Sequence, residues 1–173
     1  GSVSTPDSPD MQITSDVRIT VAFDLDAPAT QNVSLVGQRT PTANTNASFF
    51  LFTAANGSGL VRFSMNGTAW TSTFVAAPAG SIVTGRNYFG ARMVVDNGSG
   101  QHRMTGLLST DGETWTDAGS ATVAPAFVGF DSSAPLFVGA PFLSVAGLPA
   151  RIHWAQMERL DAAGNPIGVV WRF

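Results

Sequence analysis

The carboxylate side chains are the first groups in this sequence that could perform chemistry, and they comprise ten Asp and two Glu among 173 residues. A glycosidase needs two carboxyl groups that face each other across a sugar. Glu113 lies in an expected turn and Glu158 in an expected strand, so the Glu-x-Asp-x-x-Glu pattern of sandwich-fold glucanases is absent. Asp24 and Asp26 would share one strand face, but Pro28 follows them and favours a solvated turn. The carboxylates therefore provide no catalytic pair.

Other residue types with common catalytic roles are scarce. The only histidines are His102 and His153, and a zinc centre needs three or four ligands. The absence of Cys excludes thiolate zinc sites, disulfides and cysteine catalysis. All nine basic residues are Arg, so a Schiff-base lysine and a phosphate-loop lysine are excluded as well. We predict that the chain is not an enzyme.

Two loops carry oxygen ligands of the kind that calcium prefers. Asp96 and Asn97 belong to the segment Asp-Asn-Gly-Ser, and Asp131 begins the segment Asp-Ser-Ser. The same residue types form ordinary Asx turns. We interpret these residues as turn residues, keep a calcium site as the alternative, and expect no other cofactor.

Composition narrows the class of protein further. Hydrophobic residues make up 44% of the chain, which excludes a disordered chain, and charged residues only 12%. The net charge of −3 offers no electrostatic attraction to nucleic acid or to an anionic membrane. No apolar run approaches the roughly 20 residues that span a bilayer. We therefore expect a globular domain with neither nucleic acid nor a membrane as a partner.

The elements that must position any site are predicted to be strands. The clearest is Val17–Leu25, in which apolar residues alternate with polar or small ones, so we expect one buried and one wet face. Turn residues such as Asn-Gly and Asp-Gly separate the strands, and no convincing amphipathic helix occurs. The pattern predicts an all-β fold, an antiparallel two-sheet sandwich or jelly roll. The other expected strands are Val33–Gln38, Ser48–Ala54, Leu60–Met65, Trp70–Val75, Tyr88–Asp96, His102–Ser109, Leu136–Gly139, Arg151–Leu160 and Ile167–Phe173.

One short motif occurs twice. Ser64–Thr71 and Ser109–Thr116 both read Ser-x-Asx-Gly-x-x-Trp-Thr. Asn-Gly and Asp-Gly tolerate the positive φ of a type I′ turn, so each copy predicts a hairpin with a two-residue turn. The Trp that follows would fold back over the hairpin.

Aromatic side chains are the remaining candidates for a binding site. Exposed Trp faces stack on sugars, whereas buried ones build the core between two sheets. We interpret any single Trp as core unless the structure exposes it, and the two on the last strands, Trp154 and Trp171, are the least assignable. A shallow patch of loop amides with an Arg and a Trp would suit a glycan. The candidate ligand-binding residues are Trp70, Arg92, Trp154, Asn44 and Asn46.

A series of segments occurs in an informative order along nearly the whole chain. The segments are Val3–Ser8, Asp16–Ala22, Leu35–Gln38, Phe63–Trp70, Val94–Gly98, Ser109–Trp115, Pro135–Gly139 and Arg151–Ala155. In this order they resemble the laminin-G-like, concanavalin-A-like jelly rolls of minor tail proteins from phages that infect actinobacteria, and of related bacterial surface proteins. Two positions depart from the family: Tyr88 stands where relatives often have Trp, and Val94 where they often have Asp.

The resemblance implies a fold, a location and partners. It implies a concanavalin-A-like sandwich of about twelve strands that acts as a non-enzymatic module, on a virion tail or otherwise outside the cell. The implied partners are a host cell-surface glycan and other tail chains. The family has no fixed binding motif to transfer. Gly1-Ser2 are typical of a cloning remnant, and we expect residues 3–173 to form a single domain cut from a longer chain.

Two functions follow as hypotheses. The first is a glycan- or cell-surface-binding module. The second is a structural module that packs against neighbouring tail subunits through an exposed apolar patch near Val94, Trp171 and Phe173. The sequence does not define the oligomeric state.

Overall fold

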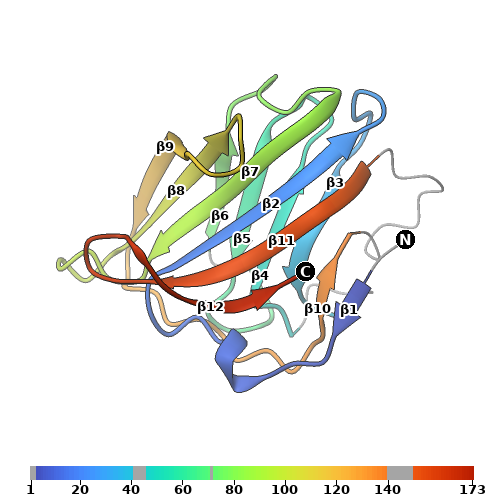
Figure 1. Ribbon diagram of the computed structural model, residues 1–173. Coiled ribbons are helices and arrows are strands. Elements are labelled where there is room, and N and C mark those ends of the chain that lie inside the picture. Colours follow the sequence, from blue (N-terminus) through green and yellow to red (C-terminus); the bar gives the residue numbers. More distant parts are fainter. Residues whose placement is uncertain (1–2, 41–45, 71, 140–149) are drawn as a thin grey trace.

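Twelve strands form two antiparallel six-stranded sheets in the computed structural model, which describes residues 3–40, 46–70, 72–139 and 150–173 (Figure 1). The first sheet, sheet A, has the order β1 (Val3–Thr5), β10 (Leu136–Val138), β3 (Val33–Gln38), β4 (Phe49–Thr53), β5 (Gly59–Phe63) and β6 (Ser72–Ala77). The second, sheet B, has the order β12 (Pro166–Arg172), β11 (Ala150–Leu160), β2 (Val17–Leu25), β7 (Gly85–Val94), β8 (His102–Ser109) and β9 (Thr116–Val123). A short 3₁₀ turn, η1 (Pro9–Met11), is the one helical element in these ranges.

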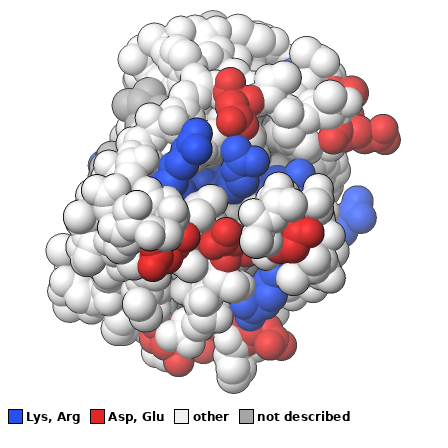
Figure 2. Space-filling view, turned by 90° about the vertical axis from the view of Figure 1, so that its left-hand side faces the viewer, with Lys and Arg blue, Asp and Glu red and all other residues white. Residues whose placement is uncertain are grey.

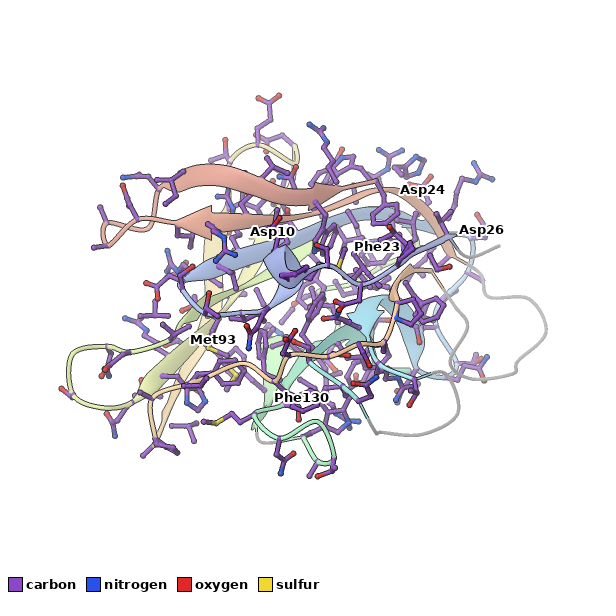
Figure 3. All side chains as sticks on the ribbon, turned by 90° about the horizontal axis from the view of Figure 1, so that it is seen from below. Asp10, Phe23, Asp24, Asp26, Met93 and Phe130 are labelled. Carbon is purple, nitrogen blue, oxygen red and sulfur yellow. The ribbon has the colours of Figure 1, made fainter. Side chains whose placement is uncertain are left out.

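The core lies between the two sheets. Side chains from both layers meet there, and Figure 3 shows Phe23 and Met93 between the layers. The alternation along β2 places its odd-numbered residues in this core, with Ile19, Val21 and Phe23 each 0% exposed. The predicted all-β, antiparallel two-sheet sandwich of the concanavalin-A-like jelly-roll type is confirmed.

The two layers lie very close together where β6 faces β8. A Cβ added to Gly106 would collide with the backbone carbonyl of Ala76 on the opposite sheet. Only glycine leaves room for that carbonyl, so Gly106 sets how closely the two sheets can pack at this point.

The face of β2 that was predicted to be solvent-exposed is less exposed than expected. Thr20 and Ala22 point away from the core, yet both are 0% exposed. The rings of Trp154 and Tyr88, the cross-strand partners of Ala22, flank this small residue. The outward side of sheet B is therefore a packed surface in its own right.

Several predicted strands match the structure, and two strands were missed. The bounds of β2, β3 and β8 agree with the prediction, whereas Trp70–Val75 corresponds to a strand that begins later, at Ser72. The strand β9 was not predicted because its sequence, Thr-Asp-Ala-Gly-Ser-Ala-Thr-Val, is mostly polar or small. An edge strand with exposed side chains needs no apolar stripe. The three-residue strand β1 was missed as well.

The two Ser-x-Asx-Gly-x-x-Trp segments form longer loops than the predicted two-residue turns. A type I′ turn requires positive φ at both central residues. In the structure φ is positive at Gly67 (72°) and at Gly112 (83°), while Asn66 and Asp111 are not among the positive-φ residues of the described chain. The prediction of type I′ turns is therefore wrong.

Side-chain acceptors explain why these loops adopt another shape. Asp111 Oδ1 accepts hydrogen bonds from the backbone amides two and three residues later, both at 2.8 Å, and Ser109 Oγ accepts one from Gly112 N at 2.8 Å. Asn66 and Ser64 make the same three contacts in the first copy, all at 3.0 Å. Asx side chains compete with backbone acceptors in this way, and the competition favours a compact loop over a tight hairpin.

Candidate functional site

The outward surface of sheet B brings together the aromatic and charged side chains that could recognise a ligand. We call this surface the outer face of sheet B. It comprises the residues of β11, β2, β7, β8 and β9 that alternate with core residues. Register places them in cross-strand rows, since Trp154 pairs with Ala22, Ala22 with Tyr88, and Tyr88 with Ser109. Residues far apart in sequence thereby become neighbours on one rigid scaffold.

An aromatic pair forms one end of this face. The rings of Trp154 and Tyr88 lie on either side of the small Ala22, with centroids 6.4 Å apart and planes tilted by 39°. Both side chains are partly exposed. A Cβ added to Gly112 would lie 2.7 Å from Tyr88 Cε1 and 3.4 Å from Trp154 Cζ2. The β8–β9 loop therefore rests against the pair and limits how its rings can move.

A charged network borders the aromatic pair. Arg86 Nε donates to Asp24 Oδ1 at 2.6 Å, and His153 Nε2 lies 2.7 Å from Asp24 Oδ2. Because a carboxylate only accepts, His153 Nε2 carries a proton in this contact. The hydrogen bond from Arg86, followed by that from His153, lowers the pKa of Asp24 below its ordinary value. The Arg86 guanidinium also lies 5.9 Å from the Tyr88 ring centroid, which joins the network to the aromatic pair.

Two hollows open beside the aromatic end. One, of about 420 Å³, is lined by Arg86, Tyr88 and the start of the β8–β9 loop. The other, of about 450 Å³, is lined by Trp154, His153 and Arg151 on one side and by Val3 of sheet A on the other. Trp154 and Tyr88 each therefore have one side that is open to a ligand.

The opposite end of the same face is rich in arginine. Arg18 and Arg92 are cross-strand partners on β2 and β7. Arg18 Nη2 lies 2.7 Å from Glu158 Oε2, and Arg92 Nη2 lies 3.2 Å from Asp117 Oδ2. A hollow of about 190 Å³ is lined by Arg92, Arg103 and other residues. Figure 2, which views this end of the molecule, shows arginine side chains in a band across a hollow, with carboxylates on both sides.

The five residues predicted to bind a ligand do not all converge. Arg92 and Trp154 share the outer face of sheet B. Trp70 lies on the outer side of sheet A, and Asn46 is hydrogen-bonded to Ser133 in a loop at 2.9 Å. Asn44 lies outside the described residues.

Trp70 belongs to a separate aromatic layer. Its ring stacks on Phe50 with centroids 6.2 Å apart, and Phe50 stacks on Phe52 at 4.9 Å. The guanidinium groups of Arg39 and Arg62 lie 4.7 and 4.9 Å from the centroids of these two phenylalanines. Burial first, and then repulsion from Arg62, lowers the pKa of Arg39. The two arginines cover the phenylalanine rings on the outer side of sheet A, so Phe52 is only 3% exposed.

Of the residues expected to form an exposed apolar patch, Val94 and Phe173 are only partly exposed and Trp171 is buried. Trp171 is buried between the sheets, where it stacks on Phe49 at 6.4 Å and packs against the edge of Phe173. The exposed apolar side chains of this strand are instead Ile167 and Val169, at 67% and 58%. Trp171 is thus a core residue, which is the interpretation that the sequence favoured for any single Trp.

The proposed calcium ligands act as turn residues in the structure. Asp96 Oδ1 accepts from Gly98 N at 2.9 Å and from Gly100 N at 3.1 Å, while Asn97 Oδ1 accepts from Ser99 N at 3.0 Å. Asp131 is exposed. Within the described ranges, no group of three or more His, Cys, Asp or Glu side chains gathers to hold a metal ion. A calcium site at these residues remains a prediction.

Sequence reasoning missed most of the partners around Trp154. It interpreted Asp24 as a turn residue, expected no zinc-binding or catalytic role for His153, and assigned no role to Arg86. The one available signal was that Asp24 and Arg86 end and begin adjacent apolar strands, but pairing those ends requires the register.

Comparison with known proteins identifies the fold but no family. No protein-family model matches the chain, and no curated protein matches it significantly. A structure of botulinum neurotoxin type C, concerned with cell entry through two ganglioside molecules, superposes with a TM-score of 0.58 over 93% of this chain, at 8% identity. The botulinum neurotoxin serotype C1 binding domain superposes with a TM-score of 0.50 over 84%, at 10% identity.

This chain spans 37% and 33% of the length of those two toxin chains. At these identities the likeness concerns architecture alone. The chain shares the jelly-roll β-sandwich fold with part of the botulinum toxin structures.

Within the described residues, no helix has the length and apolar character of a membrane span.

Proposed function

We propose that this chain is a non-catalytic module that binds a glycan or cell-surface ligand through the outer face of sheet B. The observation that supports it best is the partly exposed Trp154–Tyr88 pair, with hydrogen-bonding groups of Asp24, Arg86 and His153 beside it. All five side chains project from adjacent strands of one sheet. A rigid scaffold of this kind lowers the entropic cost of binding.

The chemistry of the pair and its neighbours suits a sugar. A pyranose ring presents an apolar C–H surface that packs on an aromatic face, and hydroxyl groups that need hydrogen-bond partners. Arg86 and His153 supply donors and Asp24 supplies an acceptor, and bonds to charged groups are the stronger ones. The site thus has both elements of glycan recognition within a short distance.

The engaged state of the carboxylates supports binding over catalysis. Asp24 uses one oxygen for Arg86 and the other for His153, and Glu158 Oε2 is held by Arg18. A general acid or base at neutral pH needs a pKa near the working pH, and Asp24 does not meet this requirement. The lowered pKa of Asp24 points the same way.

The wider setting of the module is part of the same proposal. The order of sequence segments resembles minor tail proteins of actinobacterial phages and bacterial surface proteins, so we place the module outside the cell, on a virion tail or a cell surface. Its partners would be a host-surface glycan and neighbouring tail chains. The fold is compatible with this role, because botulinum neurotoxin type C, whose cell entry depends on interaction with two ganglioside molecules, contains a similar sandwich.

Binding to a glycan array and to envelope fragments of actinobacteria tests the proposal. We expect binding that falls about tenfold or more in Trp154→Ala, since the variant loses the stacking surface. Trp70→Ala is the matched control, because it removes an indole from the opposite sheet. Absence of binding by the folded wild-type protein would refute a glycan site on this face. A loss of binding in Trp70→Ala with no loss in Trp154→Ala would refute it as well.

A second candidate function rests on the last strand. Ile167 and Val169 are exposed on β12, which is an edge strand of sheet B. Exposed apolar edges favour association with another chain. Light scattering of the wild type and of Ile167→Asp separates the candidates, because a structural module should form an oligomer that the variant weakens.

A further inference from the structure

We propose that the ligand is an anionic saccharide, with a sugar ring stacked at Trp154 and Tyr88 and a carboxylate or phosphate group bound at Arg92 and Arg103. This inference rests on the proposed function and deepens it by naming the ligand class. It follows from the placement of three arginines on adjacent strands: Arg18 on β2, Arg92 on β7 and Arg103 on β8.

The first argument is the direct opposition of two arginines. Arg18 and Arg92 are register partners in an antiparallel pair, which puts their Cβ atoms about 5 Å apart. Like charges in directly opposite positions destabilise a sheet. A carboxylate flanks each arginine, Glu158 beyond Arg18 and Asp117 beyond Arg92. The arrangement keeps two guanidinium groups adjacent on one face, with one carboxylate balancing the charge of each.

The two ion pairs differ in strength, and the difference leaves Arg92 available. Two nitrogens of Arg18 contact Glu158 Oε2, at 2.7 and 2.9 Å, and the Glu158 side chain is only 10% exposed. Arg92 Nη2 is 3.2 and 3.3 Å from the two oxygens of Asp117, whose side chain is 54% exposed. Exposed pairs of this kind contribute little to stability. A ligand anion can therefore replace Asp117 at Arg92 at small cost.

Arg103 provides a second cation with no competing partner. It is exposed, and no carboxylate in the described ranges lies within ion-pair distance of it. Arg92 pairs with Thr105, two residues from Arg103 along the same face of β8, so the two guanidinium groups can converge on one anion. They line the same 190 Å³ hollow.

The remaining acidic groups near this hollow are turned toward backbone amides. Asp16, which lines the hollow, accepts a hydrogen bond from Val95 N at 2.9 Å. Asp161 accepts from Ala163 N at 2.9 Å and from Asn165 N at 2.8 Å within the β11–β12 turn. These carboxylates keep their negative charge, but their own turns hold them, and within the described ranges neither forms an ion pair with Arg92 or Arg103.

The spacing between the two ends of the face sets the ligand size. Tyr88 and Arg92 are four residues apart on β7, which corresponds to about 13 Å along the strand. That distance is the span of a short oligosaccharide and exceeds a single sugar ring. A saccharide whose anionic group lies a few sugar units away from the stacked ring can contact the aromatic end and the arginine end of the face at once.

The test compares matched pairs of probes by calorimetry at physiological and low salt. The carboxylate arm uses an oligogalacturonate against the neutral oligogalactose of the same length, and the phosphate arm a phosphorylated oligomannose against its dephosphorylated form. We expect tighter binding of at least one anionic probe than of its neutral counterpart, with a preference that weakens as salt rises. Which arm responds identifies the anionic group.

Variants of the arginines complete the test. Arg103→Gln and Arg92→Gln should each weaken binding of the anionic probe about tenfold and leave the neutral probe unchanged. Arg62→Gln, which removes a guanidinium from the outer side of sheet A, is the matched control. Neutral probes that bind as well as anionic ones, with binding that still depends on Trp154, would overturn this inference and leave the proposed function standing. If the protein binds neither the probes nor the envelope fragments, both this inference and the proposed function are overturned.

Discussion

Substitution of Gly112 by Ala tests whether the β8–β9 loop braces the aromatic pair. Gly112 has a φ of 83°, which L-residues rarely adopt, and its added Cβ would lie 2.7 Å from Tyr88 Cε1. The variant must therefore accept backbone strain and also displace the tyrosine ring. Gly98→Ala is a matched control, because Gly98 has a φ of 84° but nothing lies within 4 Å of its added Cβ.

The structure permits separate magnitudes for the two effects. A left-handed conformation costs an L-residue roughly 1–2 kcal/mol, and this cost is common to both variants. Displacing a ring in a packed site costs about 1 kcal/mol more when the side chain can rotate away. We expect Gly98→Ala to lose only the shared cost and Gly112→Ala to lose about 1 kcal/mol beyond it.

Urea unfolding followed by fluorescence measures this difference, provided that the slope with denaturant is the same for both variants. Glycan binding is the second measurement, and Gly112→Ala should bind more weakly than Gly98→Ala because Tyr88 has moved. Equal losses of stability together with unchanged binding in Gly112→Ala would show that the loop does not hold the aromatic pair in place.

Two further predictions concern charged groups. Glu158→Gln should lower the free energy of unfolding by about 1–2 kcal/mol, because it leaves the partly buried Arg18 without its charge partner. Asp117→Asn should change the free energy of unfolding by less than about 0.5 kcal/mol. Equal effects of the two variants in urea unfolding would contradict the conclusion that the two ion pairs differ in strength. Hydrogen bonds from the Thr114 and Glu113 amides, then from Ser109, hold the pKa of Asp111 well below its ordinary value. The ionised Asp111 therefore stabilises the fold fully above the unfolded-state pKa, and this stabilisation is lost as pH falls toward the folded-state pKa. Asp111→Ala should therefore be destabilising at pH 7 by an amount that shrinks below about pH 4, while Asn66→Ala, which removes an amide from the equivalent loop, should show no such pH dependence in thermal unfolding; a parallel pH dependence in both variants would refute the assignment.

The strands that the sequence predicted correctly are those with a local pattern. The alternation in Val17–Leu25 identifies β2 without reference to any other segment, because side chains on a strand alternate between faces. The polar edge strand β9 carries no such pattern. It exists because β8 offers it a ladder of hydrogen bonds, and that partner is visible only in the folded chain.

The repeated loop motif shows the same limit on a smaller scale. Asn-Gly and Asp-Gly correctly mark two chain reversals, and the glycines have the expected positive φ. The geometry differs from a type I′ turn because Asx and Ser side chains capture the amides that a tight turn would leave free. Which acceptor wins depends on the whole loop and on its packing, such as the contact of Gly112 with Tyr88.

The sequence by itself determined the all-β class, the main strands, the absence of thiol and lysine chemistry, and the candidacy of Trp154 and Arg92. Only the tertiary structure decided that these two residues share a face with Tyr88, Arg86 and Asp24, and that Trp70 does not. The physical reason is the register of sheet B, which pairs β11 with β2 and β2 with β7 across long stretches of sequence. Composition and periodicity describe one strand at a time, whereas a binding face is assembled from several.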